Sequence, residues 1–148
     1  MSPKHLSVAG LVIGAAAILA GCATATPEQQ PPAKIVPVPG SPVPKLQLTD
    51  RAIHRLGIVT QPVLDESTTG HPAGPEVIPY SAVVYDTDGS TWTYVNTAAG
   101  TYERKPITVT DIDGQIAHLS AGPPAGTKVV TVGAAELLGT EYNISGEE

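Results

Sequence analysis

Apolar and polar residues alternate along most of the chain from residue 77 onward, and this alternation predicts β-strands. The alternating segments are residues 81–85, 91–96, 102–110, 115–120 and 128–132. Turn residues separate them, including two Asp-x-Asp-Gly runs at 86–89 and 111–114. Aspartate and glycine tolerate the positive φ that tight hairpin turns require. This part of the chain is therefore expected to form antiparallel hairpins.

A helical spacing of apolar residues comes earlier in the chain. Residues 46–48 alternate as a short strand, and Ala52, Ile53 and Leu56 then follow one face of a helix. Thr49 precedes this face as an N-cap, and Gly57 follows it as a left-handed C-cap. We expect one short helix near the N-terminal side of the domain.

The remaining segments connect or close these elements. Residues 58–63 return to an extended pattern, and residues 65–76, with their glycine, proline, serine and threonine, predict a loop. Residues 134–138 predict a helical turn, which Gly139 should end. The core is aliphatic because the chain has no Phe and one Trp. A folded part of about 100 residues buries only a modest core, so no deep pocket is expected.

The first residues differ from this domain and are typical of an export signal. Lys4 is followed by an almost continuously apolar stretch at 6–20, which is short for a membrane span. Residues 19–22 (LAGC) resemble the lipobox of bacterial lipoproteins, in which small residues precede the cut and the cysteine thiol takes the lipid. Cys22 is the only cysteine, so no internal disulfide can form. An ordinary signal peptide with a chance cysteine and an uncleaved anchor helix are the alternatives.

A proline-rich segment follows Cys22. Proline fixes φ and removes a backbone donor, so neither helix nor sheet is expected there, and simple spacing is favoured over a recognition motif. Mature lipoproteins carry several acyl chains, which hold a protein stably on a membrane. The expected organisation is a lipoprotein signal peptide at 1–21, a Pro-rich tether at 22–45, a β domain at 46–144 and a tail at 145–148.

Charge excludes one class of partner. Removing the signal takes Lys4 with it and leaves 7 basic against 14 acidic residues, a net charge of −7. A nucleic-acid surface should be basic, so no nucleic acid is expected as a partner. The same balance argues against electrostatic docking on anionic lipid, and the anchoring falls to the lipid on Cys22.

Metal and cofactor sites find no support in the sequence. The mature chain keeps three histidines, His54, His71 and His118, and none has a close ligand-spaced partner. Met1 is the only methionine and leaves with the signal, while Cys22 is used by the lipid. Soft metals prefer cysteine or methionine ligands. We expect no metal and no cofactor, and His54 is interpreted as a partly exposed helix residue.

Calcium-binding and catalytic motifs are missing from the sequence as well. A calcium loop that began at Asp86 or Asp111 would need a glutamate at its twelfth position, where the chain has Thr97 or Gly122. The chain contains no Gly-x-Ser-x-Gly elbow and no free thiol beyond Cys22. We therefore expect a protein that is not an enzyme.

Aromatic residues offer the one candidate surface. Trp92, Tyr94 and Tyr102, with Tyr80 and Tyr85, lie on neighbouring predicted strands. Aromatic residues are favoured at protein interfaces, which makes the first three a candidate partner-binding set. The favoured alternative is that the tryptophan and at least one tyrosine fill a core that lacks phenylalanine.

Several of these segments together resemble a known family. They are residues 77–84 (VIPYSAVV), the hairpin through 92–95 (WTYV), residues 102–109 (YERKPITV) and residues 120–134. They are similar to the membrane-proximal domain of the periplasmic adaptor proteins, or membrane fusion proteins, of tripartite efflux systems. Residues 46–60 are similar to the opening of the heavy-metal adaptors. The turn at 120–126 (SAGPPAG) departs from the family's Ser-Gly-Leu-x-x-Gly pattern.

The resemblance implies a fold and a partner. In the family the opening segment packs against the C-terminal strands, while a β-barrel, a lipoyl domain and a helical hairpin lie between them in sequence. Here residues 64–76 replace that middle part. The implied fold is mainly β, a small antiparallel β-barrel or sandwich-like domain with one short helix. The implied partner is an inner-membrane transporter.

The function expected from these observations is a lipid-anchored, non-enzymatic module of the cell envelope. It would bind a transporter or another envelope protein, on the outer face of the cytoplasmic membrane or in the periplasm. One alternative is a small-ligand or metal-binding lipoprotein that supports transport. Another is a surface lipoprotein that serves only as a spacer.

Overall fold

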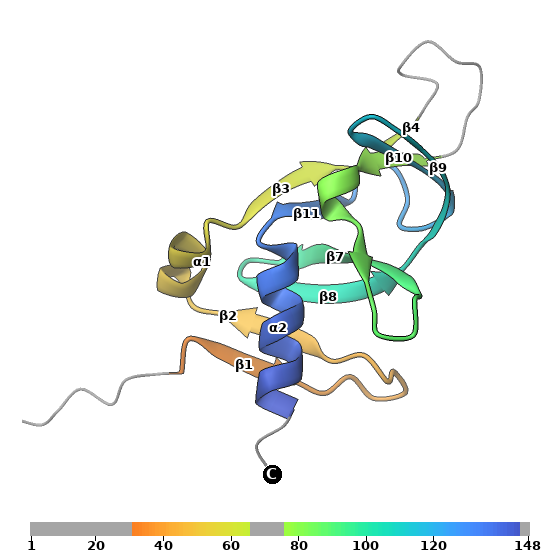
Figure 1. The fold of residues 1–148 in the computed structure, drawn as a ribbon. Helices are drawn as coiled ribbons and strands as arrows, with labels where there is room; N and C mark the ends of the chain where they lie inside the picture. The colour runs from red at the N-terminus through yellow and green to blue at the C-terminus, as the bar shows by residue number, and fades with distance from the viewer. Residues whose placement is uncertain (1–30, 66–75, 146–148) are drawn as a thin grey trace, which may run out of the picture.

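The computed structural model describes residues 31–65 and 76–145, and its architecture is mainly β (Figure 1). The elements in chain order are β1 (Ala33–Val36), β2 (Lys45–Leu48), α1 (Asp50–Leu56), β3 (Val59–Pro62), β4 (Leu64–Asp65), β5 (Glu76–Pro79), the 3-10 helix η2 (Tyr80–Ala82), β6 (Val84–Tyr85), β7 (Thr91–Ala98), β8 (Thr101–Pro106), β9 (Thr108–Asp113), β10 (Ile116–Ala121), β11 (Lys128–Val132) and α2 (Ala134–Ser145). The strands form two antiparallel sheets, as predicted, and these sheets do not close into a barrel.

The first sheet joins the two ends of the described chain. Its order is β1-β2-β8-β7-β11-β3, with β6 beside β7. Strand β2 pairs with β8, so that Leu46 lies opposite Tyr102, and β3 pairs with β11, so that Thr60 lies opposite Val130. Figure 1 shows α2 lying across one face of this sheet. Segments before residue 66 and after residue 75 therefore build one sheet.

The second sheet has the order β4-β5-β10-β9. The chain passes from β8 of the first sheet into β9 of the second through Ile107, whose N–H donates to the Thr91 carbonyl at 3.0 Å. The sequence predicted one strand over residues 102–110, but the structure divides it into β8 and β9. Pro106 explains the division because it has no N–H for the β8 ladder.

Helix α1 begins and ends as the sequence predicts. The Thr49 hydroxyl accepts a hydrogen bond from the Ala52 N–H at 3.2 Å, and such an N-cap stabilises a helix by about 1 kcal/mol. Gly57 ends the helix with φ of 63°, a conformation that costs glycine little. The short helix on the N-terminal side is thus confirmed.

The tether prediction is wrong for its last part. Residues 33–36 form β1 and pair with β2, so the sheet begins well before residue 46. Prolines flank this strand at positions 31, 32 and 37, but its four residues carry all their N–H groups. Ile35 also packs against the first core. Residues 22–30 of the predicted tether lie outside the described residues.

Two further predictions about elements are corrected. Helix α2 continues through Gly139 to Ser145 instead of ending at Gly139. Burial of one face explains this, because Leu137 is fully buried and Glu141 is 5% exposed. A glycine inside a helix costs about 1 kcal/mol, which such packing can offset. Ser81, expected inside a strand, lies in η2.

Two apolar cores lie on opposite faces of β7. Tyr94 contributes to the first, which also holds Leu46 and Leu137, between the first sheet and α2. Val95 contributes to the second, which holds Leu119 of the second sheet. Because successive side chains of a strand point to opposite faces, one central strand serves both cores.

Candidate functional site

The predicted aromatic set occupies the interior. Tyr94 is fully buried and Tyr102 is 4% exposed, and both belong to the first core. Trp92 is partly buried on the same face of β7. The prediction of a partner-binding surface is wrong for the two tyrosines, since a buried ring cannot meet a partner. The core alternative is confirmed for them.

Arg104 of β8 is the centre of a buried ionic cluster that joins the first sheet to α2. Its guanidinium pairs with Asp86 and, at 3.1 Å, with Glu141. The Tyr94 hydroxyl donates to the other oxygen of Glu141 at 2.6 Å. The guanidinium carbon also lies 4.5 Å from the centre of the Trp92 ring, close enough for a cation–π interaction. We call Asp86, Trp92, Tyr94, Arg104 and Glu141 the Arg104 cluster.

The surroundings of Asp86 and Arg104 favour their charged forms. Hydrogen bonds from the Tyr142 hydroxyl, the Thr87 N–H and Arg104 lower the pKa of Asp86 to about 2. Burial opposes the charge of Arg104, but hydrogen bonding to Asp86 and attraction by Glu141 outweigh it and raise its pKa. Burial, followed by the hydrogen bond to Glu141, raises the pKa of Tyr94. The tyrosine therefore stays a neutral donor near neutral pH.

The turn before β7 supports the cluster. The Asp88 carboxylate accepts hydrogen bonds from the Ser90 N–H at 2.9 Å and the Ser90 hydroxyl at 2.6 Å. The Trp92 indole N–H donates to the same hydroxyl at 2.7 Å. The Asp-x-Asp-Gly run thus forms a hairpin turn, with Gly89 at φ of 82°.

Three exposed tyrosines gather beside this cluster. Tyr85 of β6 is 51% exposed, and a hydrogen bond with the Tyr80 side chain raises its pKa. Tyr142 of α2 is 44% exposed and donates its hydroxyl hydrogen to Asp86, the residue that follows Tyr85. We call Tyr80, Tyr85 and Tyr142 the tyrosine patch.

Sequence reasoning missed the Arg104 cluster and Tyr142. One signal was present, because three consecutive charged residues, Glu103 to Lys105, lie inside the strand predicted over residues 102–110. A charge in such a place needs a partner. The partner Glu141 could not be found, since the helix was expected to end before it.

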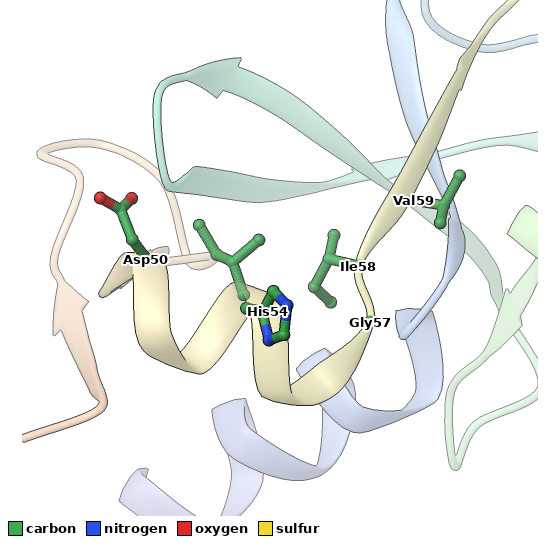
Figure 2. Close-up of a pocket in the computed structure, with 6 residues that line it drawn as sticks. Asp50, His54, Gly57, Ile58 and Val59 are labelled. Carbon is green, nitrogen blue, oxygen red and sulfur yellow. The ribbon is translucent and has the colours of Figure 1, made fainter.

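A separate shallow groove lies between α1 and β3 (Figure 2). Its volume is about 470 Å³. The lining residues are Asp50, Ile53, His54, Gly57, Ile58 and Val59. The lining is mostly apolar, and His54, an exposed helix residue, is its one imidazole. Figure 2 shows Asp50 and His54 rising from α1, with Ile58 just before β3 and Val59 at its start.

The predicted lipidation site and one of the three histidines lie outside the part of the chain that the structure describes. Cys22 and His71 lie outside the described residues. Within residues 31–65 and 76–145, no three His, Cys, Asp or Glu side chains gather closely enough to hold a metal ion. The helices of that part of the chain are all too short or too polar to cross a membrane.

Comparison with known proteins found no match to this chain among protein-family models, curated proteins or solved structures.

Proposed function

We propose that this chain is an exported lipoprotein, anchored through Cys22, whose β domain is a non-enzymatic module that binds a membrane transporter or another envelope protein. The observation that carries the proposal is the tyrosine patch, three exposed tyrosines held over a buried ionic cluster. Tyrosine gives large contact area at low entropic cost and is enriched at binding hot spots. A rigid support keeps such side chains in a binding geometry.

The resemblance to efflux adaptors adds support for the class of partner. It implies that the opening segment packs against the C-terminal strands. The pairing of β2 with β8 and of β3 with β11 agrees with that implication. Antiparallel pairing of this kind occurs in many folds, so the transporter partner rests on the resemblance and not on the pairing.

The test is site-specific photo-cross-linking in cells with the full chain. A photoreactive amino acid replaces Tyr85, and in a matched control it replaces Ile112, which is 42% exposed on β9. We expect one envelope protein to be captured from Tyr85 and not from Ile112. The double variant Tyr80→Ser with Tyr142→Ser should lower that capture about tenfold, since hot-spot truncation commonly costs more than 1 kcal/mol.

The anchor is tested in parallel. Cys22→Ser should move the protein out of the membrane fraction and lower the capture, because the domain is no longer held beside its partner. Capture that is equal from both positions, or absent from Tyr85 in membrane-bound protein, would contradict the binding proposal. Membrane retention of Cys22→Ser would contradict the lipid anchor.

A further inference from the structure

Charge is unevenly distributed over the domain, although the whole chain is acidic. The described strands of the second sheet carry four carboxylates and no lysine or arginine. The four are Asp65, Glu76, Asp111 and Asp113. In Figure 1 this sheet and α1 lie at opposite sides of the molecule. The described strands of this sheet, away from α1, therefore carry a net charge of −4.

The basic residues divide into two groups. Lys45 and Lys105 both pair with Glu103, at 3.6 and 2.5 Å, and Arg104 pairs within its cluster. Four other cations form no ion pair within the described residues: Lys34, Arg51, Arg55 and Lys128. Three of these four lie on β1 and α1, and all three are exposed. An unpaired cation keeps its full attraction for an external anion.

Exposed apolar side chains accompany these cations. Val59 is 46% exposed and Val132 is 50% exposed, and the two lie opposite each other in the β3–β11 register. Val59 and Ile58 also line the groove beside α1 (Figure 2). We call a set of exposed and partly exposed residues at this end of the domain the α1 face, which carries three cations and one carboxylate: Lys34, Asp50, Arg51, Arg55, Ile58, Val59 and Val132. Cations beside partly exposed apolar groups match the chemistry of a lipid headgroup region.

The chain enters the domain at this same end. The Pro32 carbonyl accepts a hydrogen bond at 3.1 Å from the N–H of Thr49, the N-cap of α1. Eight residues separate Cys22 from Pro31, so even a fully extended segment spans about 30 Å. A lipid on Cys22 would hold the α1 face close to the bilayer.

We infer that the α1 face lies on the anionic surface of the membrane, which orients the domain with its acidic second sheet away from the lipid. The inference rests on the proposed lipid anchor. The anchor supplies the attachment, while the cations select which side meets the lipid. The tyrosine patch stays free for a partner, since η2 and β6 lie on the other side of α2 from α1 in the view of Figure 1.

The test uses the full lipidated chain in vesicles of phosphatidylcholine alone and in an equal mixture with phosphatidylglycerol. A fluorophore is attached to a cysteine introduced at Val132 or, as a matched site on the other side, at Asp111. A lipid-borne quencher reports proximity to the bilayer. We expect quenching at Val132 and not at Asp111, stronger with phosphatidylglycerol and weaker at high salt.

Two variants separate this inference from the anchor. Arg51→Gln with Arg55→Gln should lower the preference for the anionic vesicles about fivefold per charge removed, while the protein stays membrane-bound. Lys128→Gln, an unpaired cation on β11, should leave the quenching unchanged. Equal quenching at both sites, or quenching that ignores the arginines, would overturn the orientation. Loss of all vesicle binding would instead overturn the lipid anchor.

Discussion

Arg104 shows how one residue can fix the position of a whole helix. Its side chain is 9% exposed, and its charge meets a carboxylate from the β6–β7 turn and another from α2. A buried ion pair adds little net stability compared with well-packed apolar groups, but removing one partner leaves a costly buried charge. The Arg104 cluster therefore penalises other placements of α2, and this keeps Tyr142 beside Tyr85.

Acid should weaken the fold through Asp86. Its pKa is lowered to about 2 in the folded protein, against an ordinary value of 3.8. The unfolded chain therefore binds more protons in this range, and the stability from ionised Asp86 is present above about pH 4 and lost as the pH falls toward about 2. We expect Asp86→Asn to lower the melting temperature near neutral pH and to flatten its decline in acid, as measured by circular dichroism.

The control for this prediction is Asp111→Asn, which removes a carboxylate from an exposed position of β9. It should keep the acid decline of the unchanged protein. If Asp86→Asn declines as steeply as the unchanged protein does, Asp86 is not the group responsible.

Local chemistry made some residues predictable. The Thr49 cap and the Gly57 C-cap depend on neighbours within one helical turn, and both are as predicted. The partnership of Arg104 with Glu141 depends on residues 37 positions apart in the chain. Their meeting follows from the way α2 packs on the sheet, which local spacing does not encode. The central residues of the candidate site were therefore the least predictable ones.

At the scale of elements, β1 shows that proline density does not decide a segment by itself. The strand occupies four residues between flanking prolines, and β2 supplies the partner for its hydrogen bonds. The sequence pattern favoured an extended, unpaired tether. It gives no sign that β2 has a free edge with which this segment can pair. The predicted C-terminal helix was too short for a similar reason. Burial of α2 against the sheet offsets the local cost of Gly139, and this burial cannot be read from the local sequence.

Strand β1 should contribute measurable stability. Ile35 lies opposite Leu46 and packs against the first core. We expect Ile35→Ser to lower the free energy of unfolding by about 1–2 kcal/mol, because a partly buried isoleucine loses its apolar contacts. Lys34→Gln, on the exposed face of the same strand, should change it by less than about 0.5 kcal/mol. Urea unfolding measures the free energy of unfolding of both variants. Equal values for the two would contradict a stabilising role of β1.

At the scale of the molecule, the two cores should unfold together. Strand β7 contributes Tyr94 to one core and Val95 to the other, so neither core can be lost without exposing β7. Leu119→Ala removes a fully buried side chain from the second core and should cost about 2–5 kcal/mol. Trp92, the only tryptophan, lies on the same face of β7 as Tyr94 of the first core and contacts Arg104, so its fluorescence reports on that face.

We therefore expect Leu119→Ala to shift the urea midpoint of Trp92 fluorescence as far as it shifts the midpoint of far-UV circular dichroism. Ile116→Ala, at a side chain 39% exposed on the same strand, should shift both by much less. If the dichroism transition moved while the fluorescence transition stayed in place, the second sheet would be an independent unit. The tyrosine patch would then be supported by the first core alone, because Tyr142 and Tyr85 belong to α2 and to β6 of the first sheet.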